Sequence, residues 1–158
     1  MRFTLLTLPG RGDTEPFIAL GKRLLRDGHD VKLAARPDVA DLVEERRIAF
    51  APVGNSYQPF IAGAAKAGAV GSSHPWRKLT YGVSQRRYVS ENLANDAFEA
   101  AQGTDAIIYK WPWISGHTIA EKLGVPCIPV MLLPLLPTSV FPSFLMGRGG
   151  PSALPRSP

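Results

Sequence analysis

The chain opens with Arg2-Phe-Thr-Leu-Leu-Thr-Leu8, continues with Pro9-Gly-Arg-Gly-Asp-Thr-Glu-Pro16 and then reads Phe17-Ile-Ala-Leu-Gly-Lys-Arg-Leu-Leu-Arg-Asp-Gly28. The run from Phe3 to Leu8 is short, apolar and uncharged, which is typical of a central strand in a parallel sheet covered on both faces. The glycines of the second run permit a tight turn, and Pro16 suits the first turn of a helix. These residues predict a strand, a loop and a helix. The polar loop then lies at the carboxyl end of the first strand, where open α/β folds bind their ligands.

The rest of the chain repeats this alternation of strand and helix. Apolar residues after Pro16 recur at helical spacing, and Gly28 is a typical end signal for that helix. Strands that alternate with helices of about ten residues imply right-handed crossovers and a parallel sheet. We therefore expect a Rossmann-like α/β domain with helices on both faces of a five-stranded sheet of order 3-2-1-4-5. The later strands are expected at 30–35, 48–53, 106–110 and 126–131, and the later helices at 38–47, 83–102 and 115–123.

Two stretches lack this periodicity. Residues 55–80 are interrupted by glycines and a proline and carry aromatic residues, so we expect an excursion, with one short helix, that forms a wall of a binding cleft. Beyond Leu132 the sequence is rich in leucine and proline and then in glycine. The sequence therefore predicts a domain over 1–146 and an irregular tail over 147–158.

Composition limits the classes of protein to consider. The 158 residues, 45% hydrophobic, are typical of one globular domain. The net charge of +5 is spread without a basic run, which argues against a nucleic-acid partner. The single cysteine, Cys127, excludes an internal disulfide and a thiolate metal cluster, and its apolar surroundings indicate core packing.

Targeting signals are also limited by the sequence. The apolar run before Pro9 is too short for a signal peptide, and three prolines in 125–136 rule out a spanning helix there. We expect a cytoplasmic protein without a transmembrane segment; contact with a membrane surface stays open.

The stretch from Pro9 to Leu25 closely resembles the start of the N-terminal domain of GT-B glycosyltransferases of family 28 and of the sterol and antibiotic glucosyltransferase type. Their opening pattern is G-S-R-G-D-x-x-P-x-x-A-L-x-x-x-L, from which this chain departs at Pro9. Matches continue in order over about 140 positions. They are Gly28-His-Asp-Val31, Phe50-Ala-Pro-Val-Gly54, Asp105-Ala-Ile-Ile-Tyr109, Gly116-His-Thr-Ile-Ala-Glu121, Leu123-Gly-Val-Pro126, Leu136-Pro-Thr138 and Phe141-Pro142.

The resemblance implies a fold and an activity. In that family two Rossmann-like domains face each other across a cleft; the N-terminal one binds the acceptor and the C-terminal one binds a nucleotide sugar. The resemblance thus implies the acceptor-binding half of an inverting hexosyltransferase, which moves a sugar from a UDP- or dTDP-hexose to a hydroxyl of a lipid, sterol or aglycone without a metal or other cofactor. We expect the donor-binding domain to be absent here and this chain to be inactive by itself, or to pair with a separate donor-domain polypeptide.

Inverting transfer requires a base that removes the proton of the acceptor hydroxyl as its oxygen attacks the anomeric carbon. The resemblance places Asp13 at the position proposed for this base. A second interpretation is that Asp13 only caps the following helix, by accepting N–H bonds from its first turn. Both interpretations stay open at this point.

The resemblance also suggests residues that contact the substrates. The glycines of the opening loop would shape the acceptor side, and Arg11 would contact the donor phosphates or the other domain, unless it is simply solvated. His117 belongs to a matched motif on the cleft side. Apolar residues near the strand ends would line the acceptor pocket, although core packing explains them equally well. The candidate substrate-binding residues are Gly10, Arg11, Gly12, Trp111, His117 and Leu136.

Two other functions remain as alternatives. Gly10 and Gly12 begin a dinucleotide-binding pattern, but its third glycine would fall on Glu15, whose carboxylate repels a pyrophosphate. A dinucleotide-dependent oxidoreductase is therefore disfavoured. A non-catalytic module that binds a small apolar ligand also fits the sequence.

Overall fold

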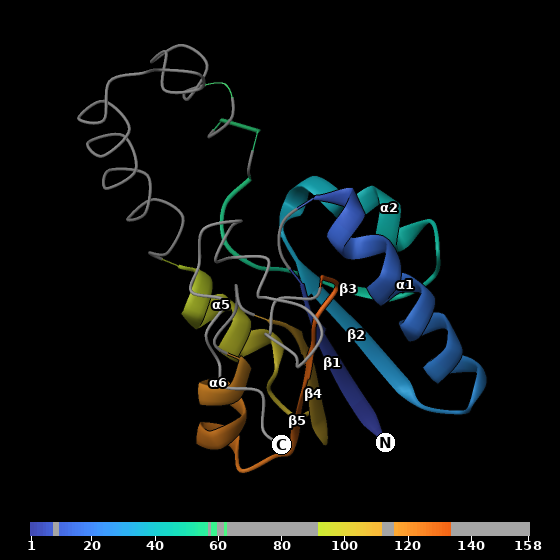
Figure 1. The fold of residues 1–158 in the computed structure, drawn as a ribbon, viewed down its shortest axis with the longest axis vertical. Coiled ribbons are helices and arrows are strands. Elements are labelled where there is room, and N and C mark those ends of the chain that lie inside the picture. The colour runs from blue at the N-terminus through green and yellow to red at the C-terminus, as the bar shows by residue number, and fades with distance from the viewer. Residues whose placement is uncertain (8–9, 57, 60–61, 63–91, 112–115, 134–158) are drawn as a thin grey trace, which may run out of the picture.

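In the part of the chain that the structure describes, five parallel strands form one sheet of order β3-β2-β1-β4-β5 (Figure 1). The structure is a computed structural model and describes residues 1–7, 10–56, 58–59, 62, 92–111 and 116–133. The predicted strand order and Rossmann-like class are confirmed. The strands are β1 (Arg2–Leu6), β2 (Asp30–Ala35), β3 (Ala49–Pro52), β4 (Ala106–Lys110) and β5 (Cys127–Val130).

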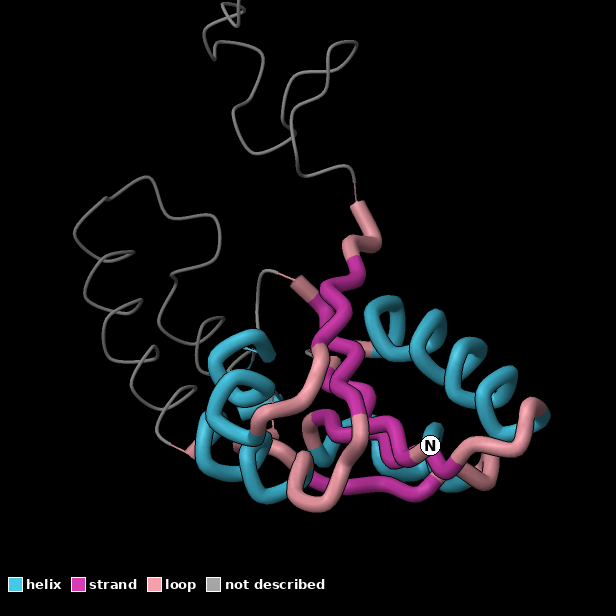
Figure 2. Tube along the Cα trace, turned by 90° about the horizontal axis from the view of Figure 1, so that it is seen from below, coloured by secondary structure: helices cyan, strands magenta, loops and turns pink. Residues whose placement is uncertain are grey.

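Helices cover both faces of the sheet, as Figures 1 and 2 show from two directions. Among the described residues, two α-helices lie on one face and two on the other. The first pair is α1 (Arg11–Arg26) and α2 (Ala40–Glu44), the latter preceded by a 3-10 turn (Pro37–Val39), and the second pair is α5 (Leu93–Ala100) and α6 (Gly116–Leu123).

Alternating side chains of the strands fill two separate cores. Leu5 of β1 packs with Phe17 and Ile18 of α1, whereas its neighbour Leu6 packs with α5 and α6, and both leucines are fully buried. The same alternation recurs in β2 and β4. Each fully buried aliphatic side chain contributes roughly 1.5–3 kcal/mol relative to an exposed one. The uninterrupted apolar run of the first strand is therefore explained by burial on both sides.

The first helix begins earlier than the sequence predicts. Its first residue is Arg11, so the predicted loop over 9–16 is wrong and Pro16 is the sixth residue of the helix. Gly10, at φ +99°, turns the chain at once, and its carbonyl accepts the backbone N–H of Thr14 at 3.2 Å and the Thr14 hydroxyl at 3.0 Å. Because Pro16 has no N–H, the helix lacks only the hydrogen bond from residue 16 to the carbonyl of Gly12. Gly12 is exposed, so water can bind this carbonyl instead.

Other predicted boundaries shift by a few residues. The predicted helix over 38–47 is divided into the 3-10 turn and the short α2, and Arg47 takes a left-handed conformation with φ 60°. The predicted helix over 83–102 corresponds to α5 within the described residues. The predictions for 63–80, for Leu136 and for the tail over 147–158 lie outside the described residues.

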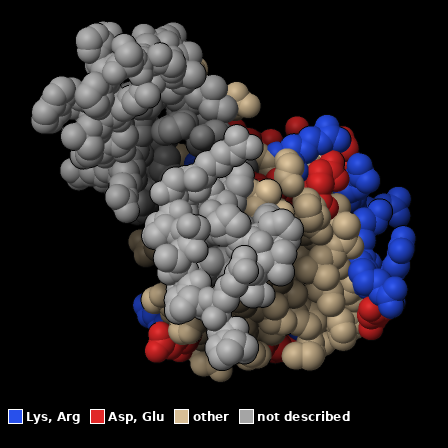
Figure 3. Space-filling view, in the orientation of Figure 1, with Lys and Arg blue, Asp and Glu red and all other residues tan. Residues whose placement is uncertain are grey.

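The outer face of α1 is charged, and Figure 3 shows its Lys and Arg side chains gathered on one side of the molecule. Arg11 pairs with Glu15 at 3.0 Å and Arg23 pairs with Asp27 at 2.9 Å, each four residues apart. Exposed pairs of this kind contribute little to stability, about 0.3–0.5 kcal/mol each. They mark the solvent side of an amphipathic helix.

In the described part of the chain, β5 is an outermost strand of the sheet, next to β4. The backbone N–H groups of Ile107 and Trp111 donate to the carbonyls of Pro126 and Val130, at 3.0 and 3.1 Å. Ile128 of this strand is 51% exposed. Within the described part of the chain, β5 is therefore paired along one side and partly open to solvent.

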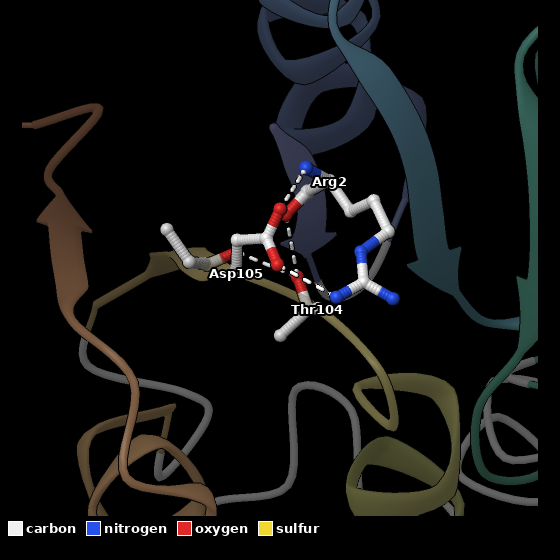
Figure 4. Close-up of polar contacts among 4 residues, drawn as sticks. Arg2, Thr104 and Asp105 are labelled. Carbon is white, nitrogen blue, oxygen red and sulfur yellow. Dashed lines mark hydrogen bonds and ion pairs between the residues drawn. The ribbon is translucent and has the colours of Figure 1, made fainter.

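At the amino-terminal edge, one ion pair joins the first strand to the fourth (Figure 4). The Arg2 guanidinium and backbone N–H both donate to the Asp105 carboxylate at 2.7 Å, and the Thr104 hydroxyl donates to the Arg2 carbonyl at 3.0 Å. The hydrogen bond from the Arg2 side chain, and next the one from its backbone, hold the pKa of Asp105 below its ordinary 3.8. These contacts fix the relative start of β1 and β4.

The lowered pKa of Asp105 predicts a pH-dependent contribution to stability. This contribution is fully present above the unfolded value of 3.8 and is lost as pH falls through the lower folded value. We expect Asp105→Asn to unfold at a lower temperature than the parent near neutral pH, with a difference that disappears in strong acid. Thermal denaturation across an acid pH series measures it, and Arg2→Gln should reduce the same difference. A difference that stays constant down to the lowest pH would contradict the assignment.

The close approach of Gly116 to Tyr109 predicts a second effect on stability. A Cβ at Gly116 would lie 2.2 Å from the Tyr109 Cγ and 2.7 Å from its Cβ, atoms that a rotation of the ring cannot move away. We expect Gly116→Ala to lower the free energy of unfolding by about 1–3 kcal/mol, as over-packing does. Denaturant unfolding measures it. Gly12→Ala is the control, because no atom lies within 4 Å of its added methyl group; equal stability of the two variants would refute the packing argument.

Candidate functional site

Polar side chains gather at the carboxyl-terminal edge of the sheet. Thr7 follows β1, Arg36 follows β2 and Lys110 ends β4, and all three are buried. An Nη1 N–H of Arg36 donates to the carbonyl of Asn55, just after β3. Because parallel strands end at the same edge, these groups from distant parts of the sequence share one region.

The first turn of α1 places Asp13 over this edge. Gly10 is the N-cap residue of α1, four residues after the end of β1, and the Thr7 hydroxyl donates to the Asp13 carbonyl at 3.2 Å. These contacts fix the backbone of Asp13 against the end of β1. The side chain of Asp13 is 27% exposed, so it is accessible from solvent while its backbone is held by the sheet.

Asp13 forms an ion pair with Lys110 across the edge of the sheet. The Asp13 Oδ1 lies 2.7 Å from the Lys110 Nζ, and the lysine side chain is only 10% exposed. Ile108, two residues earlier in β4, packs on the α1 face, so the alternation of the strand directs Lys110 to the same face. An ammonium group so deeply buried requires an opposite charge nearby, because its desolvation is costly. The pair therefore combines a nearly buried cation with a more accessible carboxylate.

The sequence prediction missed Lys110 and gave it no role. A signal for it exists in the sequence: Ala106-Ile-Ile-Tyr-Lys110 is an apolar strand that ends in a charged residue. All five residues of this strand are buried. A lysine at the end of such a strand indicates a partner of opposite charge, although the sequence does not say which carboxylate provides it.

The interpretation of Asp13 as a capping residue finds limited support. The N-cap position is Gly10, and α1 has no side-chain capping hydrogen bond there. In the described contacts the Asp13 carboxylate pairs with Lys110 rather than with an N–H group of the helix. Its place in the first turn still favours the helix, because a negative charge there interacts well with the helix dipole.

The other predicted site residues fall into two groups. Gly10, Arg11 and Gly12 lie beside Asp13 in the first turn of α1, with Arg11 paired to Glu15. Trp111 follows β4 and packs, half-buried, against the core on the α5 and α6 face, while His117 is an exposed residue at the start of α6. The two groups share an edge of the sheet but lie on opposite faces of it. Leu136 lies outside the described residues.

Two further properties bear on substrates. Within residues 1–7, 10–56, 58–59, 62, 92–111 and 116–133, no helix has the length and apolar character needed to cross a bilayer. The same residues contain no group of three His, Cys, Asp or Glu side chains placed to hold a metal ion. The expectation that the protein uses no metal or cofactor stays a prediction.

The parallel sheet and its strand order define a Rossmann-like α/β domain, a class of fold in which ligands bind at the carboxyl edge of the sheet. The sequence profile described as the glycosyltransferase family 28 N-terminal domain matches residues 3–142. The chain belongs to this family, and the resemblance seen in the sequence is confirmed.

Curated relatives agree with this assignment. A sterol 3-beta-glucosyltransferase of Neurospora crassa is 33% identical over 147 residues, which cover 92% of this chain and 9% of that protein. A sterol 3-beta-glucosyltransferase of Yarrowia lipolytica is 33% identical over 143 residues, which cover 90% of this chain and 10% of that protein. The chain therefore spans about a tenth of the length of these relatives.

Solved structures share the fold. The calicheamicin glycosyltransferase has a TM-score of 0.64 at 19% identity, over 83% of this chain and 32% of that one. A glycosyltransferase of Streptomyces sp. SF2575, complexed with thymidine diphosphate, has a TM-score of 0.60 at 18% identity, over 83% of this chain and 38% of that one. These structures are GT-B glycosyltransferases, so the expected N-terminal GT-B half is confirmed as the fold.

The ion pair predicts a coupling between two substitutions. We expect Asp13→Asn to lower the free energy of unfolding by about 1–3 kcal/mol, less than for a fully buried pair, because Asp13 reaches solvent. Lys110→Met should cost a similar amount, and the double variant should lose less than the sum of the two by about 1 kcal/mol or more. Denaturant unfolding of all four proteins measures the coupling. Strictly additive losses would mean that the pair is not formed in solution.

Proposed function

We propose that this chain is the acceptor-binding half of an inverting hexosyltransferase that glycosylates a hydroxyl group of a lipophilic acceptor. Family membership supports sugar transfer in general. The acceptor class is taken from the relatives, which are named sterol 3-beta-glucosyltransferases. The nucleotide-sugar donor is suggested by the structural relative complexed with thymidine diphosphate.

The single observation that carries the proposal is the position of Asp13. Its carboxylate lies at the carboxyl edge of the sheet, is 27% exposed and pairs through one oxygen with Lys110. A carboxylate is an acceptor of hydrogen bonds, so it can receive the acceptor hydroxyl and then its proton as the oxygen attacks the anomeric carbon. The nucleoside diphosphate would leave on the opposite side of the sugar.

The proposal assigns acceptor binding and donor binding to two different domains. We propose that this chain binds the acceptor through the edge beside α1, and that a donor-binding half, in the same or a separate polypeptide, holds the nucleotide sugar. Gly10, Arg11 and Gly12 would lie against the substrates, and Trp111 and His117 would border the acceptor from the other face. A cytoplasmic location belongs to the same proposal.

The test is acceptor binding and sugar transfer by the purified chain. Quenching of its three tryptophans would report binding of cholesterol presented from cyclodextrin, and product mass would report transfer from UDP- or dTDP-glucose. We expect binding by the chain alone, and transfer only when the donor-binding half of a sterol glucosyltransferase is added. Absence of binding would overturn the acceptor assignment, and transfer by the chain alone would overturn the division of work.

The role of Asp13 predicts a large kinetic effect. In any arrangement that transfers sugar, we expect Asp13→Ala to lower kcat by roughly 10²–10⁴, the usual contribution of a general base. The acceptor KM should also rise, by about tenfold or more, because the hydrogen bond from the acceptor hydroxyl to the Asp13 carboxylate is lost. Steady-state kinetics with varied acceptor measure both constants. A kcat within a factor of a few of the parent would leave Asp13 with a structural role only.

A further inference from the structure

We propose that Lys110 is a positioning residue for the transfer reaction: it holds the Oδ1 of Asp13 so that the second carboxylate oxygen faces the acceptor hydroxyl. This inference rests on the proposed function of Asp13 and adds a residue from a different strand. It follows from the 2.7 Å contact between the Lys110 Nζ and the Asp13 Oδ1.

The lysine is attached to one of the most firmly held parts of the sheet. It ends β4, whose five residues are all buried and which pairs with β1 on one side and β5 on the other. The next residue, Trp111, continues the pairing by donating its N–H to the Val130 carbonyl at 3.1 Å. A charged group on a packed strand keeps its place better than one on a loop, which is the requirement for orienting a reacting group.

Asp13 contacts two strand ends. Its backbone carbonyl accepts a hydrogen bond from the Thr7 hydroxyl, just after β1, and its Oδ1 forms the ion pair with Lys110 of β4. The other oxygen, Oδ2, accepts no hydrogen bond from another described residue. A carboxylate with two oxygens accepts several hydrogen bonds, so a lysine on one oxygen leaves the other available to a hydroxyl donor. The greater exposure of Asp13, 27% against 10% for Lys110, places the carboxylate on the side of an entering ligand.

The chain offers a matched control in Lys32 of β2. Its Nζ donates to the carbonyl of Ala100 at 3.1 Å, in a partly buried position. This lysine therefore also binds through its ammonium group to another element, but to a backbone carbonyl on the α5 face instead of a carboxylate beside α1. The variant Lys32→Met therefore shows how removal of a structural lysine changes stability and ligand affinity when the contacts of Asp13 are unchanged.

The experiment compares two ligands that differ at one oxygen, where a methyl group replaces the hydroxyl proton. Cholesterol carries a free hydroxyl, and its 3-methyl ether has no proton to give to Asp13. We expect the parent chain to bind cholesterol at least about tenfold more tightly than the ether, because a hydrogen bond to a charged group is lost. Asp13→Asn and Lys110→Met should lose this preference, while Lys110→Arg should keep most of it and Lys32→Met all of it. A ratio of two affinities on the same variant is insensitive to a general loss of stability.

The outcomes separate this inference from the proposed function. If Asp13→Asn loses the preference and Lys110→Met keeps it, the role of Lys110 is overturned and that of Asp13 stands. If the parent has no preference, or binds neither ligand, both are overturned. If Lys110→Met fails to fold, Lys110→Arg and Lys110→Gln replace it in the test. We expect Lys110→Arg to keep the preference for cholesterol over the ether and Lys110→Gln to lose it. The opposite result would refute the inference.

Discussion

The position of β1 between β2 and β4 is the constraint on which the rest of the molecule depends. Its register with both neighbours is parallel, so its side chains are buried alternately under α1 on one face and under α5 and α6 on the other. A strand buried in this way has no room for charge along its length. The charged groups that pair β1 and α1 with β4 consequently lie at the two ends of the sheet: Arg2 and Asp105 at the amino-terminal edge, and Asp13 and Lys110 at the carboxyl-terminal edge.

The two edges differ in what their charges can do. Arg2 and Asp105 are both well exposed, at 59% and 36%, so water screens their attraction and can replace either partner. Lys110 is nearly buried and depends on a carboxylate for compensation, whereas Asp13 remains accessible. A ligand that approaches Asp13 therefore meets a carboxylate whose Oδ1 is already paired with Lys110. This asymmetry distinguishes a candidate reactive site from a structural ion pair.

Much of the fold could be predicted from the sequence because burial on both faces leaves a local pattern. The strand over 30–35 is predicted with its correct bounds, and the strand order follows from the alternation of strands and helices. The start of α1 could not be predicted in this way, since Pro16 is a usual first-turn residue and the left-handed turn at Gly10 is one of several conformations open to glycine. The partner of Asp13 was missed for a different reason: Lys110 is distant in the sequence, and only the parallel pairing of β1 with β4 brings the two together.

The pairing of β5 has a consequence for the association of the chain with copies of itself. Because the carbonyls of Pro126 and Val130 point toward β4, the alternation of a parallel strand directs the nitrogen of Pro129 to the outer side of the sheet. A proline at this position has no N–H, so a strand added beside β5 would form one hydrogen bond fewer. Unprotected outer strands recruit other chains into continuous sheets, and proline is a common means of preventing it. Among the described residues, the outer side of β5 therefore lacks the N–H of Pro129 in the same strand that exposes Ile128, and this makes the strand a poorer template for another chain.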